Sequence, residues 1–74
     1  MFRRSNLIGF RHQKGLTQTQ MAKISGVGLS TYNFIEKGKQ DGKLKFWDAL
    51  KEHFNLTGEE ICELQKKEQL TQGF

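Results

Sequence analysis

The stretch from Thr17 to Gly38 constrains the fold of this chain more than any other, because it combines a helix start, a glycine turn and a second helix. Thr17 and Gln20 have the S/T-x-x-E/Q spacing of a capping box, in which each side chain satisfies a backbone N–H at a helix start. Gly26 can take the left-handed conformation that ends a helix, and Gly28 is a tolerable N-cap for the next one. A turn this short makes the two helices cross at a large angle, so the second helix projects from the first.

The second helix, predicted over Leu29–Lys37, has an unusual outer face. Tyr32 and Ile35 share the side that faces the core, at about 100° per residue. A solvated face is usually filled with Lys and Glu, but the opposite side combines a hydroxyl, an amide, an aromatic ring and one cation. These residues are Ser30, Asn33, Phe34 and Lys37. Their composition is typical of a surface that recognises a partner, and Gly38 predicts the end of the helix.

Taken together, these features resemble the helix-turn-helix of the Cro and phage-repressor (XRE-like) family over about Leu7 to Ile61. The family pattern is an Arg four residues before a G-L-T-Q start, an apolar-Ala pair, a G-V turn and a second helix ending in I-E-x-G. Here it is carried by Arg11, Gly15-Leu16-Thr17-Gln18, Met21-Ala22, Gly26-Val27, Tyr32, Ile35-Glu36 and Gly38. The resemblance implies an all-α, five-helix, lambda-repressor-like domain with a central helix-turn-helix at about residues 17–38.

The resemblance also implies a transcriptional regulator, of the repressor or Cro type, that binds double-stranded DNA in a sequence-specific way and catalyses no reaction. Leu29, Ser30 and Phe34 lie at the base-reading positions of the family, with Thr31 and Asn33 as neighbours. Because no Arg on this face can grip guanine, we expect hydroxyl and amide hydrogen bonds, contacts with thymine methyl groups and an A·T-rich site. The remaining residues expected at DNA are Thr17, Gln18, Gly28, Lys37, Lys39 and Lys43.

Phosphate contacts are expected on both sides of this helix. The resemblance places the Gln18 side chain and the N-terminus of its helix against the DNA backbone. Lys37, Lys39 and Lys43 follow the recognition helix, where contacts with phosphates add salt dependence without reading sequence. The alternative for the three lysines is that they solvate a polar loop.

A structural ion pair is a further implication of the resemblance. In the family, the Arg at the place of Arg11 pairs with the Glu at the place of Glu36, locking the first helix to the end of the recognition helix. The alternative is a loose surface pair worth less than about 1 kcal/mol.

The rest of the chain predicts three more helices within a single domain of 74 residues, 1–74. A first helix over about Ser5–Gln13 presents Leu7 and Phe10 inward. A strongly amphipathic helix over Leu44–Asn55 follows a loop with a D-G turn signal, and its buried stripe comprises Phe46, Trp47, Leu50 and Phe54. A second capping box at residues 57–60 starts the last helix, and residues 69–74 are expected to fray.

The N-terminal segment leaves an alternative open. Arg3 and Arg4 form either a basic arm along DNA or, as we favour, a frayed and solvated terminus.

We expect a homodimer on a palindromic operator, since one recognition helix touches too few base pairs for useful selectivity. The interface predicted for it is the last helix and tail, with Ile61, Leu64, Leu70 and Phe74.

Composition limits the function classes. The net charge of +4 favours a polyanion without proving one, and the single Cys62 allows no internal disulfide. His12 and His53 have no partners at ligand spacing, so we expect no metal site, and the sequence predicts no cofactor or small-molecule ligand. No apolar run is long enough to span a bilayer, and a lone cysteine fits a reducing cytoplasm, which is where we expect the protein. The resemblance implies a bacterial or phage-encoded protein associated with the nucleoid.

The main alternative function is a protein-interaction module on the same fold, such as an antitoxin or a regulator-binding protein. In that class, Leu29 and Phe34 would anchor a protein groove rather than contact bases.

Overall fold

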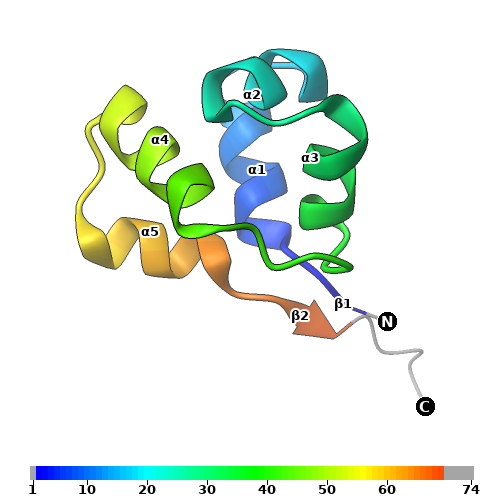
Figure 1. The fold of residues 1–74 in the computed structure, drawn as a ribbon. Coiled ribbons are helices and arrows are strands. Elements are labelled where there is room, and N and C mark those ends of the chain that lie inside the picture. The colour runs from blue at the N-terminus through cyan, green and yellow to red at the C-terminus, as the bar shows by residue number, and fades with distance from the viewer. Residues whose placement is uncertain (1, 70–74) are drawn as a thin grey trace.

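Five helices pack around one core in the computed structural model, which describes residues 2–69 (Figure 1). The all-α prediction is confirmed. The helix predicted over Leu29–Lys37 ends one residue earlier than expected, and so does the helix predicted over Leu44–Asn55. The helices are α1 Ser5–Gln13, α2 Gln18–Ser25, α3 Leu29–Glu36, α4 Leu44–Phe54 and α5 Gly58–Gln65.

Both predicted capping boxes are present. The Thr17 hydroxyl accepts from the backbone N–H of Gln20 at 3.1 Å, and the Gln20 side-chain oxygen accepts from the Thr17 N–H at 2.8 Å. The same pair of bonds joins Thr57 and Glu60 at the start of α5. Gly26 ends α2 with a φ of 77°, the left-handed conformation that the sequence assigned to it.

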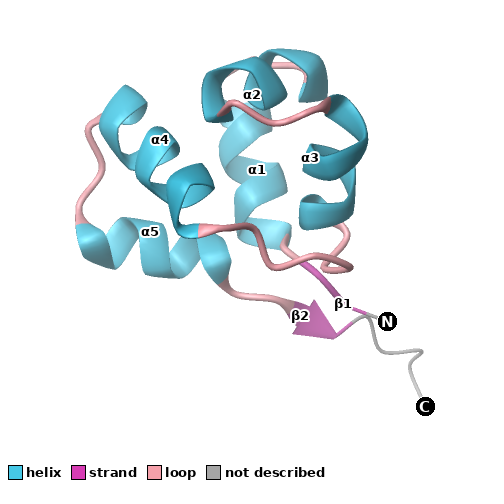
Figure 2. Cartoon of the chain, in the orientation of Figure 1, coloured by secondary structure: helices cyan, strands magenta, loops and turns pink. Residues whose placement is uncertain are grey.

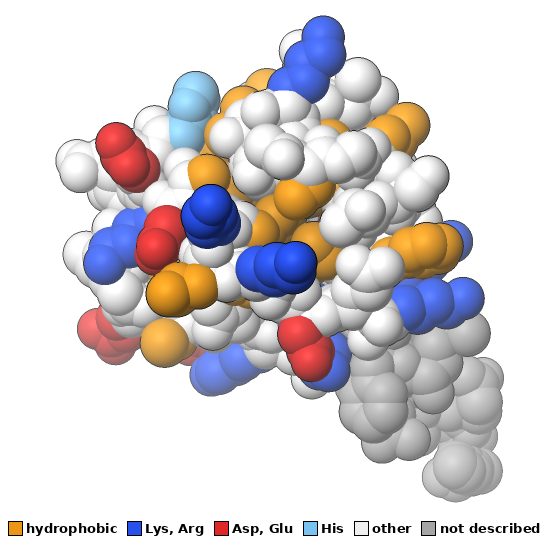
Figure 3. All heavy atoms as spheres, in the orientation of Figure 1, with side chains coloured by type: hydrophobic (Ala, Val, Ile, Leu, Met, Phe, Trp, Pro, Cys, Tyr) orange, Lys and Arg blue, Asp and Glu red, His pale blue; other side chains and the backbone are white. Residues whose placement is uncertain are grey.

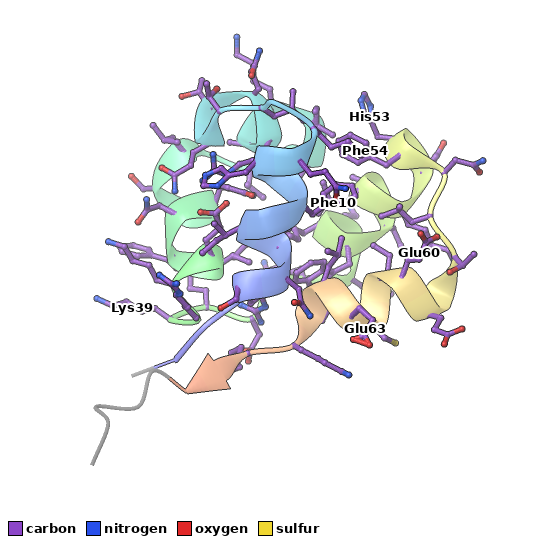
Figure 4. All side chains as sticks on the ribbon, turned by 180° about the vertical axis from the view of Figure 1, so that it is seen from behind. Phe10, Lys39, His53, Phe54, Glu60 and Glu63 are labelled. Atoms are coloured by element: carbon purple, nitrogen blue, oxygen red, sulfur yellow. The ribbon has the colours of Figure 1, made fainter. Side chains whose placement is uncertain are left out.

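The core lies where the sequence placed it. Phe10 of α1 and Phe54 of α4 meet edge to face, with ring centroids 5.0 Å apart, on the side of the molecule seen in Figure 4. Helix α2 packs against α3 and α4, and α1 packs against α5 and α3. The buried apolar residues are Leu7, Met21, Ala22, Tyr32, Ile35, Phe46, Trp47, Leu50, Ile61 and Leu64.

The N-terminal segment corrects both expectations for it. Strand β1 (Phe2–Arg3) pairs antiparallel with β2 (Glu68–Gln69), with Phe2 opposite Gln69. Arg4 is only 3% exposed, and its guanidinium donates to the backbone carbonyls of Ile35 at 2.6 Å and Gln40 at 2.8 Å. The segment is neither frayed nor available to DNA at Arg4, because buried carbonyl oxygens fix this side chain.

The loop between α3 and α4 has no regular structure, as expected, but it is tightly held (Figure 2). The Trp47 indole N–H donates to the Asp41 carbonyl at 3.1 Å, and Arg4 donates to the same oxygen at 3.3 Å. Gly42 has a φ of 76°, and a Cβ there would lie 3.1 Å from the Trp47 indole nitrogen. Only glycine fits this turn without strain.

The predicted dimer interface needs correction. Ile61 and Leu64 are 7% and 6% exposed inside the domain, so they belong to the core and cannot meet a partner. Leu70 and Phe74, with the rest of the tail after Gln69, lie outside the described residues.

Candidate nucleic-acid interface

On the structure, the outer face of α3 begins with Leu29 and continues through Ser30, Asn33 and Phe34, and all of these except the half-buried Asn33 are exposed. Leu29 is 48% exposed and Phe34 is 39% exposed, so two large apolar side chains meet solvent on this face. With Gln18 of α2, these four residues line a shallow hollow of about 270 Å³. The hollow therefore has apolar walls and amide and hydroxyl groups between them.

Behind this face lies a buried carboxylate. Glu36 Oε2 accepts from Arg11 Nε at 2.7 Å, so the ion pair implied by the resemblance is present. Its side chain is 4% exposed and that of Arg11 is 12% exposed, which makes the pair internal rather than a loose surface contact. Arg11 also donates to the Leu16 carbonyl at 3.1 Å, which ties α1 to the start of the motif.

Tyr32 is a partner of Glu36 that the sequence did not identify. Its hydroxyl donates to Glu36 Oε2 at 2.6 Å, and burial together with this bond raises the pKa of Tyr32 well above its ordinary value. Tyr32 was expected only as an inward-facing core residue. The spacing of i and i+4 on one helix is the signal that could have revealed the bond.

Gln18 also contributes to this cluster, instead of simply facing outward. Its amide nitrogen donates to Glu36 Oε1 at 2.9 Å, and its oxygen accepts from Asn33 Nδ2 at 3.2 Å. The side chain expected at DNA phosphate thus connects a buried carboxylate to the outer face of α3. The N-terminus of α2 remains open, because only part of its first turn is capped by Thr17.

The other predicted site residues lie on two flanks of α3. Gly28, Thr31 and Lys43 line a larger hollow of about 600 Å³ between the α2–α3 turn and the start of α4. Its floor is apolar, with Ile35 and Phe46 among its lining residues. We regard the smaller hollow as the better recognition site, because the larger one does not include the outer face of α3.

Lys37 and Lys39 lie just beyond the C-terminal end of α3, and both are exposed. The Lys39 ammonium is 6.0 Å from the centroid of the Phe34 ring, and its backbone N–H donates to the Phe34 carbonyl at 2.9 Å. A cation is thereby placed beside the largest apolar group of the outer face.

Charge is divided unevenly along the chain. The first forty residues carry seven of the Lys and Arg residues and one acid, Glu36, whereas the other half carries five and seven. Since Glu36 is buried, the α1–α3 half has no exposed carboxylate that would repel an anion. In Figure 3 the carboxylates lie over α4, α5 and the loop, and in Figure 4 Glu60 and Glu63 lie on α5, away from Lys39.

Residues 2–69 also bear on two further patterns, a membrane-spanning helix and a metal-ligand cluster. No helix there is long and apolar enough to cross a membrane. Within the same residues, His, Cys, Asp and Glu side chains form no group of three that could hold a metal ion.

The comparisons with known proteins agree with this geometry at the level of a family. Residues 10–61 match the family model described as helix-turn-helix, and this span includes every residue that the sequence placed at DNA. No curated protein and no solved structure matches the chain.

Proposed function

Because the chain belongs to the Cro/C1-type helix-turn-helix family, we propose that this DNA-binding regulator recognises specific sequences in double-stranded DNA. Helix α3 enters the major groove, which admits an α-helix and displays a distinct pattern of donors and acceptors for each base pair. The observation that carries this proposal is the outer face of α3, where polar and apolar side chains are mixed and point away from the hydrophobic core.

Base recognition comes from the hollow on this face. Ser30 and Asn33 supply hydrogen-bonding groups, while Leu29 and Phe34 supply apolar surface for thymine methyl groups. Thr31 lies beside them at the edge of the second hollow. The site is therefore richer in A·T pairs than random DNA.

Phosphate contacts come from both flanks. The open N-terminus of α2 after Thr17 and the N-terminus of α3 after Gly28 present backbone N–H groups to one strand. Lys37 and Lys39 provide charge beyond the C-terminal end of α3, and Lys43 provides charge at the start of α4, beside the hollow that Gly28 also lines. Each lysine contact with a phosphate steepens the salt dependence of binding without selecting a sequence.

The protein acts as a homodimer on a palindromic operator. Two α3 helices related by a two-fold axis would read half-sites one helical turn, about 34 Å, apart. Selectivity from a single short helix is too low for a regulator, because a monomer contacts few base pairs.

The test is selection of bound duplexes from a random pool, followed by titration of the recovered sequence. We expect an A·T-rich palindrome that binds more tightly than scrambled DNA on the order of a thousandfold or more. Recovery of no preferred sequence would refute the proposal.

Matched variants assign the binding face. Leu29→Ala should weaken binding to the recovered sequence, whereas Leu44→Ala, which removes a leucine that is 75% exposed on α4, should not. Lys39→Ala should reduce the slope of log K against log salt by about 1, and Lys51→Ala on the exposed side of α4 should leave the slope unchanged.

A second candidate function follows from the exposure of Leu29 and Phe34. Apolar anchors of this kind also suit a protein groove, as in an antitoxin or a regulator-binding protein. A mobility shift that is abolished by modest salt and shows no sequence preference would favour this class.

A further inference from the structure

Three hydrogen-bonding side chains connect the interior to the outer face of α3 in a fixed order. Glu36 accepts from Gln18 Nε2 at 2.9 Å, and Gln18 Oε1 in turn accepts from Asn33 Nδ2 at 3.2 Å. Gln18 belongs to α2 and the other two residues to α3, so the relay crosses between the helices of the motif.

The charge of Glu36 determines the direction of both bonds. An ionised carboxylate only accepts hydrogen bonds, so Gln18 must turn its NH₂ group toward Glu36. Its carbonyl oxygen then faces Asn33, which must also present an NH₂ group. Glu36 itself is held by Arg11 at 2.7 Å and Tyr32 at 2.6 Å, so the origin of the relay is rigid.

The relay leaves Asn33 with a defined hydrogen-bonding pattern. One N–H of its amide is used by Gln18, while the second N–H and Oδ1 have no side-chain partner among residues 2–69. Asn33 is half-buried and lines the hollow between Leu29 and Phe34. A donor and an acceptor on one amide match N7 and the N6 amino group of adenine in the major groove.

We propose that Asn33 is a specificity-determining residue that reads an adenine, and that the Gln18 side chain is the positioning residue that orients it. This inference rests on the proposed binding of duplex DNA. It gives Gln18 a role different from the phosphate contact expected from the sequence, because a positioning residue changes base preference and a phosphate contact weakens all duplexes alike.

The test replaces each adenine of the recovered half-site, one at a time, with 7-deazaadenine, which lacks the N7 acceptor. At one position, wild-type protein should bind on the order of fivefold more weakly than to normal adenine, the lower end of the range for a bidentate contact, because only the bond to N7 is lost. Asn33→Ala should be insensitive to the replacement at that position only.

Two Gln18 variants test the relay. Gln18→Ala removes both hydrogen bonds, and Gln18→Met keeps the length of the side chain if the alanine variant is unstable. Both should reduce the 7-deazaadenine penalty at the Asn33 position and leave the other positions unchanged. The matched control is Gln20→Ala, which alters the same helix at its capping box without touching Asn33.

Amide NMR of the DNA-free protein supplies a second readout. The Asn33 side-chain NH₂ resonances should move in Gln18→Met and stay in place in Gln20→Ala, because only Gln18 bonds to that amide.

Uniform weakening of all duplexes by the Gln18 variants, with the 7-deazaadenine penalty intact, would overturn the inference and restore a phosphate role. An unchanged adenine preference in Asn33→Ala would also overturn it. These results differ from a failure of the proposed function, in which wild-type protein itself selects no sequence.

Discussion

Glu36 and Arg4 are two buried charges in one small domain, and they are stabilised in opposite ways. Their side chains are 4% and 3% exposed. Glu36 is surrounded by side-chain donors: Arg11, Tyr32 and Gln18. Arg4 is surrounded mainly by main-chain carbonyl oxygens, and its one carboxylate contact among the described residues, Asp41 at 3.4 Å, is 80% exposed.

The hydrogen-bond acceptors of Arg4 show why backbone carbonyls can stabilise a buried positive charge. The last carbonyl groups of a helix have no intrahelical partner and carry partial negative charge. Arg4 Nη1 donates a hydrogen bond to the Ile35 carbonyl near the end of α3 at 2.6 Å, and Nε donates to the Gln65 carbonyl at the end of α5 at 3.1 Å. Burial lowers the pKa of Arg4, and Asp41 opposes that shift.

The two clusters therefore hold different segments of the chain against α3. The Glu36 cluster ties α1 and α2 to α3 directly behind the outer face of α3. The Arg4 cluster ties the N-terminal segment and the end of α5 to the C-terminal end of α3.

The largest expected loss of stability comes from Arg11→Ala. Removing the cation leaves the Glu36 carboxylate buried without its counter-charge, which should cost about 3 to 5 kcal/mol of unfolding free energy. Denaturant titration measures the loss.

A compensating variant checks the cause. Arg11→Met combined with Glu36→Gln should recover most of the stability, because no unpaired charge remains. An unfolding midpoint for Arg11→Ala equal to that of wild type would mean that the pair does not stabilise the fold.

Arg4→Ala should cost somewhat less, about 2 to 4 kcal/mol, because a buried carbonyl that loses its donor costs about 1 to 3 kcal/mol. The Arg4 guanidinium also lies 5.4 Å from the centroid of the Trp47 ring, so packing is lost as well. Arg3→Ala is the matched control, since it removes the exposed neighbour and should stay within about 0.5 kcal/mol of wild type. Equal effects of the two substitutions would contradict the role given to Arg4.

Asp41→Asn should have the smallest effect. Hydrogen bonding and charge from Lys67, with a smaller contribution from Arg4, lower the pKa of Asp41 below its ordinary value. The carboxylate therefore stabilises the folded state above its unfolded-state pKa, and this contribution disappears as the pH falls through the folded-state pKa. Wild-type thermal midpoints should fall toward those of Asp41→Asn in acid, and parallel curves at every pH would contradict this linkage.

The sequence predicted the parts of this molecule that depend on local patterns. The capping boxes at Thr17 and Thr57 fixed the starts of α2 and α5, and helical periodicity placed Tyr32 and Ile35 in the core. The family resemblance supplied the pairing of Arg11 with Glu36. Each of these features depends on side-chain types that recur at a regular spacing in the sequence.

The parts that could not be predicted depend on partners far apart in the chain. Arg4 donates to backbone carbonyls 31 and 61 residues away, and every residue type has the same backbone carbonyl, so no sequence pattern marks these partners. Gln18 looked like a surface residue because its partners lie on the next helix. The β1–β2 ladder joins two-residue strands, which are too short to show alternation.

The measurement that most directly tests recognition by the outer face of α3 is binding of Phe34→Ala to duplexes that carry thymine or uracil in the recovered site. Phe34 is 39% exposed, so the substitution should leave unfolding free energy within about 1 kcal/mol of wild type. It should also remove about 1 to 3 kcal/mol of discrimination for thymine at one base pair per half-site. Wild-type protein should prefer thymine to uracil at that pair, because only the C5-methyl group differs, and Phe34→Ala should not. Unfolding of the variant, or equal affinity of wild-type protein for the two duplexes, would contradict the account.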